Sequence, residues 1–190
     1  MIAADRVAAL LLAGGLSRRY GADDKLVADH AGRPLAVHAR DSLAGFACRF
    51  AVVRAGAGAL GALLAAGGLR LIENAAPEEG MAGSIRLGVA AAAALDVEAL
   101  LICLADMPRI DGALLARMCA DYDPDIGLLV CAAGGRRMPP ALIGRRHFAD
   151  LGKLTGDVGA RDLLAGAPVL AIGAAIALDV DRPVDGAGAP

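Results

Sequence analysis

A continuous apolar run near the N-terminus constrains the fold more than any other feature of the chain. Val7–Leu12 carries no charge and is followed, after one alanine, by Gly14 and Gly15. An apolar run of this length bounded by glycines predicts a strand buried on both faces, which is typical of a parallel sheet. The loop after such a strand lies at its carboxyl end, where open α/β sheets bind their ligands.

The segment after this strand combines glycine, a hydroxyl and cations, with Ser17, Arg19, Gly21 and Lys25 in order. Glycines let backbone N–H groups approach a polyphosphate, which Arg19 and Lys25 can neutralise. The segment is not a P-loop, because Lys25 neither follows Gly21 directly nor precedes a hydroxyl residue. It also lacks the Gly-x-Gly-x-x-Gly spacing of dinucleotide-binding loops. Two glycines alone would indicate only a tight turn, but the ordered set indicates phosphate positioning.

Apolar strand patterns alternate with helical patterns along the rest of the chain. The predicted strands are Val7–Leu12, Phe50–Arg54, Leu69–Ile72, Ala99–Leu104, Ile126–Cys131, Ala141–Ile143 and Val169–Ile172. The predicted helices are Pro34–Leu43, Gly58–Ala66, Ser84–Leu95, Gly112–Asp121 and Arg145–Leu151. This alternation predicts right-handed βαβ units in one α/β domain over residues 1–190, a three-layer α/β/α sandwich with a Rossmann-like, mostly parallel sheet.

Charge and hydropathy narrow the possible partners. The net charge is -2, basic residues are dispersed and only 3% of residues are aromatic, which argues against nucleic-acid binding. The longest apolar stretch, Leu87–Leu104, contains Asp96 and Glu98 and is therefore not expected to span a membrane. No signal-peptide pattern precedes the first strand, so we expect a cytoplasmic protein without membrane contact.

Cysteine and histidine spacing predicts no metal centre. Cys48, Cys103, Cys119 and Cys131 lack the Cys-x-x-Cys spacing. We interpret them as small buried apolar side chains in a reducing cytosol. The three histidines are too scattered for a zinc site.

Two acidic segments are candidate metal ligands. The predicted strand Ala99–Leu104 delivers Asp106 at its carboxyl end, where a carboxylate is costly unless it is solvated, paired or bound to a metal. A turn or cap before Pro108 explains the position of Asp106 equally well. Asp179 and Asp181 point to the same side of an extended segment and repel unless a cation joins them. A solvated turn is the alternative for these two acids.

A glycine-rich stretch, Glu78–Gly88, is predicted to run as a loop into a helix, with Ser84 near the cap position. Free N–H groups at a helix start suit an anion or the edge of a base. An ordinary helix N-terminus, which needs no ligand, is the alternative interpretation.

The order of these motifs resembles that of the MobA-like nucleotidyltransferases, with their signature Leu-Ala-Gly-Gly-x-Ser-x-Arg-x-Gly-x-x-Asp-Lys at one residue of spacing tolerance. The resemblance implies the nucleotide-diphospho-sugar transferase type of fold and a first loop that wraps the triphosphate of an NTP. It places the following residues at the nucleotide: Leu12, Ala13, Gly14, Gly15, Ser17, Arg19 and Lys25. It also implies that Asp106 holds Mg²⁺ together with Asp179, for which Asp181 is the alternate.

Later motifs resemble the molybdenum cofactor cytidylyltransferase branch of this family. Gly80–Arg86 is similar to its base-recognition loop, which assigns base contacts to Gly80, Gly83 and Ser84. Two further segments, Gly134–Leu142 and Leu154–Leu164, resemble its acceptor segments and imply the acceptor-binding residues Arg137, Pro140, Asp157 and Arg161. Met138 and Pro139 depart from the family pattern, in which glycine and a polar residue stand.

The resemblance implies a Mg²⁺-dependent transfer of CMP from CTP to a phosphorylated, molybdopterin-type acceptor, with release of pyrophosphate. Arg19, Lys25 and Asp106 are the expected catalytic residues. Nucleotide binding is expected in residues 1–108 and acceptor binding in residues 109–185, before a tail at residues 186–190. The alternatives are a GTP-dependent guanylyltransferase, favoured by the Leu-Ala-Gly-Gly form of the first motif, and a non-catalytic cofactor chaperone for a molybdoenzyme.

Overall fold

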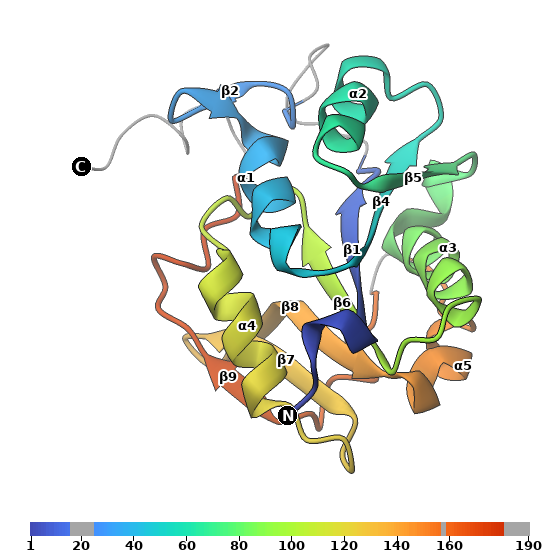
Figure 1. The fold of residues 1–190 in the computed structure, drawn as a ribbon, viewed down its shortest axis with the longest axis vertical. Coiled ribbons are helices and arrows are strands. Elements are labelled where there is room, and N and C mark those ends of the chain that lie inside the picture. The colour runs from blue at the N-terminus through green and yellow to red at the C-terminus, as the bar shows by residue number, and fades with distance from the viewer. Residues whose placement is uncertain (16–24, 157–158, 181–190) are drawn as a thin grey trace.

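A computed structural model describes residues 1–15, 25–156 and 159–180 of the chain. Seven strands form one sheet in the order β5-β4-β1-β6-β8-β7-β9, and β2 and β3 form a separate hairpin (Figure 1). The strands are Val7–Ala13 (β1), Asp29–His30 (β2), Arg33–Pro34 (β3), Cys48–Arg54 (β4), Arg70–Asn74 (β5), Ala99–Leu104 (β6), Leu128–Ala133 (β7), Arg136–Gly144 (β8) and Val169–Ala171 (β9). Strand β8 runs antiparallel to β6 and β7, and the other neighbouring pairs of the sheet are parallel.

Helices cover both faces of the sheet. They are Leu35–Ser42 (α1), Gly58–Ala66 (α2), Gly80–Ala93 (α3), Gly112–Asp121 (α4) and Phe148–Leu151 (α5). Buried side chains of α1, α2 and α4 share one apolar cluster, and those of α3 and α5 share a second. The three-layer, mostly parallel α/β sandwich expected from the sequence is therefore confirmed.

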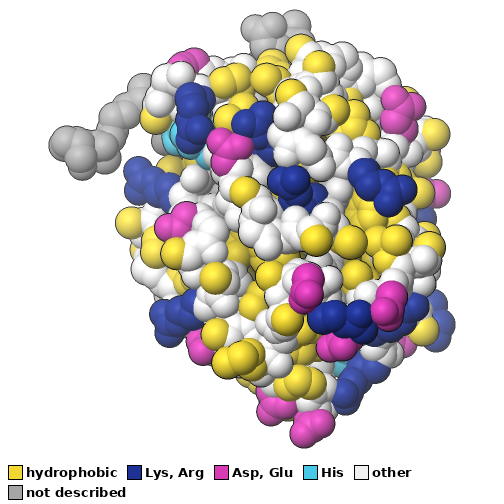
Figure 2. Space-filling model, viewed as in Figure 1, with side chains coloured by type: hydrophobic (Ala, Val, Ile, Leu, Met, Phe, Trp, Pro, Cys, Tyr) yellow, Lys and Arg dark blue, Asp and Glu magenta, His cyan; other side chains and the backbone are white. Residues whose placement is uncertain are grey.

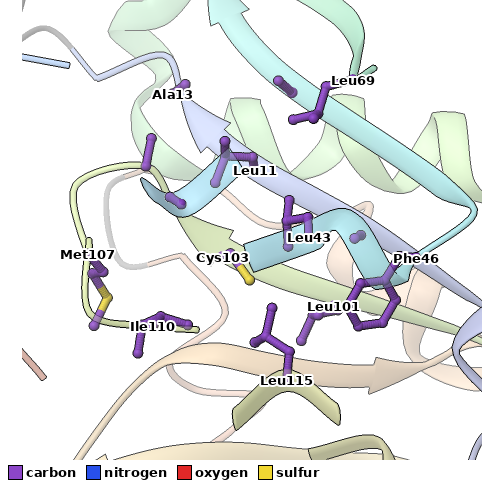
Figure 3. Close-up of a cluster of buried hydrophobic side chains, with 14 of the residues drawn as sticks. Leu11, Ala13, Leu43, Phe46, Leu69, Leu101, Cys103, Met107, Ile110 and Leu115 are labelled. Atoms are coloured by element: carbon purple, nitrogen blue, oxygen red, sulfur yellow. The ribbon is translucent and has the colours of Figure 1, made fainter. Parts of the chain in front are cut away.

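Strand β1 lies inside the sheet, between β4 and β6, and is buried along its whole length. Its odd-numbered residues from Val7 to Ala13 belong to the first cluster, and Ala8, Leu10 and Leu12 belong to the second. Figure 3 shows Leu11 of β1 in the first cluster, where the buried side chains include Leu115 of α4. Burying one such large side chain stabilises the fold by roughly 1.5–3 kcal/mol.

Several element boundaries differ from the sequence expectation. The helix expected to start at Ser84 begins at Gly80, so the expected glycine-rich loop is the first turn of α3 and Ser84 lies inside the helix. The short strand expected at Ala141–Ile143 is the end of β8, which begins at Arg136 beyond the positive-φ pair Gly134 and Gly135. Glycine tolerates that backbone conformation without steric cost, which lets β7 turn directly into β8.

Helix α3 packs unusually close to β1. A Cβ atom added at Gly88 would lie 2.2 Å from Cδ2 of Leu10. The absence of a side chain at Gly88 therefore lets the axis of α3 approach the sheet at Leu10.

The structure also tests two further expectations, that no segment spans a membrane and that the cysteines are buried apolar side chains. Within residues 1–15, 25–156 and 159–180, no helix combines the length and apolarity needed to cross a bilayer. All four cysteines are free thiols, and Cys103, Cys119 and Cys131 are buried. This burial confirms the interpretation of these three as apolar packing residues, whereas Cys48 is only half-buried.

Candidate functional site

The strand order creates a switch point next to β1. The chain runs from β1 to β4 and β5 on one side and then returns to β6 on the other side of β1. Ligands of open α/β sheets bind outside the carboxyl ends of the strands at such a point. Gly14 and Gly15 follow β1 there, and Asp106 follows β6. The N–H of Ala105 donates to the carbonyl of Leu12 at 3.1 Å, which joins the two ends.

Asp106 and Lys25 form an ion pair at this edge. The Nζ atom of Lys25 lies 2.6 Å from Oδ2 of Asp106 and 3.1 Å from the carbonyl oxygen of Val180. The side chains are only 13% and 22% exposed, for Lys25 and Asp106 respectively. Because both charges are largely withdrawn from water, each depends on the other for compensation.

The second carboxylate oxygen of Asp106 has a different environment. Oδ1 is buried and accepts no hydrogen bond from the residues that the structure describes. The N–H of Val180 donates to the backbone carbonyl of Asp106 at 3.0 Å, so the segment that carries the exposed Asp179 lies directly beside it. A buried carboxylate oxygen without a partner is costly, and Mg²⁺ and similar hard cations are bound through one or two carboxylates. The residues therefore fit a divalent cation, although the described residues hold no cluster of three metal-ligating side chains.

A buried polar pair lies on the other side of β1. Asn74, the last residue of β5, donates from Nδ2 to Oγ of Ser84 at 3.2 Å. Its Oδ1 accepts the N–H of Ala76 at 2.9 Å. A Cβ atom added at Gly14 would lie 3.4 Å from the Ser84 oxygen, so the glycine loop and α3 meet at this hydroxyl.

The segment around Gly156 packs against the N-terminal half of α3. Arg86 donates from Nη1 to the carbonyl of Leu154 at 2.6 Å, and its Nη2 forms an ion pair with Glu79. The N–H of Ala82 donates to the carbonyl of Gly156 at 3.1 Å. This contact uses one of the N–H groups that the sequence suggested were free for an anion. It also brings the expected acceptor segment to the expected base-recognition segment.

Strand β8 delivers the other expected acceptor segment. Ala141 pairs with Ile102, so the residues before Ala141 extend toward the carboxyl end of β6, where Asp106 lies. Arg137 is exposed and donates from Nη2 to the carbonyl of Ala167 at 3.2 Å, whereas Pro140 is buried. The ladder with β7, in which Arg137 pairs with Ala132, thus places Arg137 toward the edge of the sheet that carries Asp106.

The other predicted site residues differ in how far their side chains are exposed. Leu12 and Ala13 are buried, so only their backbone faces the switch point. Gly83 is buried within α3, and Arg161 is exposed in a turn. The remaining predicted residues, Ser17, Arg19, Asp157 and Asp181, lie outside the described residues.

Sequence reasoning missed Asn74. The predicted strand stopped at Ile72, which left Asn74 in a stretch that resembles a turn before Pro77. A polar residue at the carboxyl end of a parallel strand was the available signal, because that is where such sheets bind ligands.

Charges elsewhere on the surface are mixed. On the face shown in Figure 2, cationic and anionic side chains of the described residues alternate without forming a basic stripe. Arg6, for example, pairs with Asp96 at 2.9 Å and thereby lowers the pKa of that carboxyl. This distribution agrees with the dispersed basic residues of the sequence.

Comparison with known proteins identifies a family that covers most of the chain. The family profile of the MobA-like NTP transferase domain matches residues 9–172. No protein of curated function matches the chain in sequence.

Solved structures share the fold over nearly the full length. Rv0371c from Mycobacterium tuberculosis is 26% identical, with a TM-score of 0.78 and 96% of each chain covered. A nucleotidyl transferase from Methanothermobacter is 19% identical, with a TM-score of 0.78 and coverage of 95% of this chain and 94% of that one. The inositol-1-phosphate CTP transferase of T. maritima is 18% identical, with a TM-score of 0.68 and coverage of 97% and 93%. These likenesses establish a fold of the nucleotide-diphospho-sugar transferase type.

Proposed function

Because the chain belongs to the MobA-like NTP transferase family, a family of NTP-dependent nucleotidyltransferases, we propose that it transfers CMP from CTP to a phosphorylated, molybdopterin-type acceptor. The observation that carries this proposal is the Asp106–Lys25 pair beside the glycine loop at the switch point. A carboxylate with one paired and one orphaned oxygen suits a metal-assisted phosphate site.

The proposed reaction is an in-line displacement at the α-phosphorus of CTP. An oxygen of the acceptor phosphate forms a bond to the α-phosphorus as the bond to the α–β bridging oxygen breaks, and pyrophosphate leaves with that oxygen. A phosphate monoester is already an anion at neutral pH, so no general base is needed. Lys25 and Arg19 would neutralise charge on the transferred group and the leaving group.

A divalent cation would complete the charge compensation. Asp106, through its orphaned Oδ1, and Asp179 are the proposed ligands, and Mg²⁺ is the proposed ion. When bound, such a cation stabilises the charge that develops on the phosphoryl oxygens. A structure of Rv0371c in complex with manganese, 24% identical to this chain with a TM-score of 0.73, supports a divalent metal in this fold.

The choice of cytosine rests on α3 and on the acceptor segments. The sequence of Gly80–Arg86 favours the cytidylyl branch, and Ser84 presents a hydroxyl beside Gly14. One structural neighbour is named as a CTP transferase, which supports CTP as the nucleotide proposed here. The Leu-Ala-Gly-Gly form of the first motif favours GTP and makes guanylyl transfer the second candidate.

A direct assay tests the proposal. The protein is incubated with Mg²⁺, a molybdopterin-type acceptor and each of CTP, GTP, UTP and ATP, and released pyrophosphate is measured. We expect pyrophosphate with CTP, at a rate about ten- to a hundredfold above that with GTP. A higher rate with GTP would establish the second candidate. Nucleotide binding without turnover would instead support the alternative that this protein is a non-catalytic chaperone, which holds a cofactor for a molybdoenzyme.

A further inference from the structure

Asn74 and Ser84 are two of the three buried polar or charged residues of the described core, the third being Ser42. Ser42 donates to the carbonyl of Ala39 within its own helix and needs no other partner. One hydrogen bond joins Asn74 and Ser84 across two elements, at the edge of the sheet that carries the candidate site. A buried amide is costly if it is left unpaired, so the orientation of the Asn74 side chain is strongly determined.

The orientation of the Asn74 amide follows from its neighbours. The atom that contacts Ala76 must be the oxygen, because a backbone N–H can only donate. The atom that faces Ser84 is therefore the nitrogen, and Ser84 acts as the acceptor. A hydroxyl that accepts this bond keeps its own proton for a different partner. Within the described residues, the Ser84 hydroxyl donates no hydrogen bond.

The free proton of Ser84 lies next to the glycine loop. Its oxygen would be 3.4 Å from a Cβ atom on Gly14, so only the missing side chain of the glycine separates the hydroxyl from the loop. Serine in a helix commonly donates to a carbonyl one turn earlier, and this serine does not. The Asn74 amide thus holds the hydroxyl away from that local bond.

We propose that Asn74 is a positioning residue that turns the Ser84 hydroxyl into a hydrogen-bond donor toward the bound nucleotide. This inference rests on the proposed function, because it takes the glycine loop as the nucleotide site. A donor at this point matches the O2 and N3 atoms of cytosine, which are both acceptors. The matching edge of guanine presents the N1 and N2 donors, which would face the serine proton unfavourably. The Asn74–Ser84 pair therefore provides a physical reason for the proposed preference for CTP over GTP.

The test is a double-mutant cycle with nucleotide affinity as the readout. Asn74→Asp keeps an acceptor for Ala76 but replaces the donating nitrogen with a second acceptor oxygen, so the Ser84 proton turns inward. We expect the dissociation constant for CTP with Mg²⁺, measured by calorimetry, to rise about tenfold or more, and that for GTP to change less. Combined with Ser84→Ala, Asn74→Asp should have no further effect.

Two further variants separate positioning from folding. Asn74→Ala is uncharged and leaves the hydroxyl free to bond within its own helix, so it should weaken CTP binding even if Asn74→Asp fails to fold. Ser42→Ala removes a buried hydroxyl far from the site and serves as the matched control, with unchanged affinity for CTP.

Each outcome decides between the ideas. If the Asn74 variants weaken binding equally with and without Ser84, Asn74 contacts the nucleotide itself and the inference is overturned. An unchanged affinity in the Asn74 variants overturns it as well, while the proposed function stands. If the wild type binds GTP best and the coupling appears with GTP, the positioning role stands and the cytidylyl assignment fails. If no nucleotide binds to the wild type, both ideas fail.

Discussion

At the scale of single residues, Asp106 and Lys25 are held in place by each other. The short ion pair compensates both charges in a region with little solvent. The carbonyl of Val180 accepts a further bond from Lys25, which fixes the ammonium group at the edge of the sheet. The pair is thus positioned before any ligand arrives, and only Oδ1 of Asp106 lacks a partner.

Asp106→Asn keeps the shape of the side chain and removes its charge. We expect the rate of pyrophosphate release to fall by about 10³-fold or more, because charge compensation at the transferred phosphate is lost. The exposed Asp96, substituted as Asp96→Asn, is the matched control and should leave the rate unchanged. A folded Asp106→Asn protein with a near-normal rate would remove Asp106 from the site.

Lys25→Ala should weaken nucleotide binding and lower the rate together, because a lysine on phosphate acts in both the ground state and the transition state. Loss of a charge-assisted hydrogen bond of about 1.5–3 kcal/mol corresponds to a rise of roughly ten- to a hundredfold in the dissociation constant for CTP. The exposed Lys153, changed to alanine, is the control. An unchanged affinity measured by calorimetry would show that Lys25 only balances Asp106.

The sequence identified Asp106 and Lys25 as candidate site residues, but it did not predict that their side chains contact each other. A carboxylate at the end of an apolar strand and a cation after a glycine loop are visible as patterns. Their ion pair depends on β1 and β6 being neighbours, which no local pattern reveals. Asn74 was not predicted because an asparagine near a proline is typical of a turn, and only the tertiary structure shows that it is buried.

At the scale of elements, α3 connects the proposed nucleotide site to the expected acceptor segment. It packs on β1 through Gly88 and holds residues 154–156 through Arg86 and Ala82. The position of this helix therefore affects both halves of the proposed reaction.

Gly88→Val should destabilise the fold by about 1–3 kcal/mol, because a side chain would overlap the fully buried Leu10. Urea denaturation with a fluorescent probe of unfolding measures the change. Gly166→Val is the matched control, because a Cβ atom at Gly166 meets nothing within 4 Å. Equal midpoints for the two variants would show that α3 does not need its close approach to the sheet.

Arg86→Gln should loosen the segment that contains Leu154 and Gly156, because the bond to the Leu154 carbonyl and the ion pair with Glu79 are both lost. We expect amide hydrogen exchange at Ala82, whose N–H donates to Gly156, to accelerate about tenfold. Arg117→Gln, which breaks an exposed pair within α4, should leave that exchange rate unchanged. Unchanged exchange in Arg86→Gln would mean that Ala82 and Gly156 hold the segment without Arg86.

Element boundaries were predictable where the apolar pattern itself begins and ends. The predicted bounds of Gly58–Ala66, Gly112–Asp121 and Ala99–Leu104 agree with α2, α4 and β6. The start of α3 was misplaced because Gly80 and Gly83 indicate a loop by propensity, whereas the helix is packed against residues 154–156 and 159. The direction of β8 was not predictable, because apolar periodicity does not depend on which way a strand runs.

At the scale of the whole molecule, the first of the two apolar clusters keeps three of the four thiols out of water. Burial raises the pKa of Cys103 and Cys119, and it raises the pKa of Cys131 to about 12. Because only the thiolate reacts, these thiols should be inert in the folded protein at neutral and mildly alkaline pH. Cys48 is half-buried and is the accessible thiol.

A thiol reagent at pH 8 should therefore modify Cys48 at least about 100-fold faster than the three buried cysteines. Denaturant should make all four thiols react at similar rates, since the pKa shifts depend on the fold. Cys48→Ser should abolish the fast phase. Rapid modification of two or more thiols in the native protein would contradict the buried positions of Cys103, Cys119 and Cys131.

The place of β1 between β4 and β6 affects how the sheet forms during synthesis. β1 is made before the other strands of this sheet, yet Val7 pairs with Ala99, far along the chain. Until β6 has been synthesised, β1 has β4 on one side and an open, apolar edge on the other. Such an edge invites pairing with other chains, and long-range pairing of this kind folds slowly. A nascent chain interrupted before β6 would thus carry the glycine loop at the end of an aggregation-prone strand. It would also lack Asp106, which follows β6 and lies beside that loop in the folded protein.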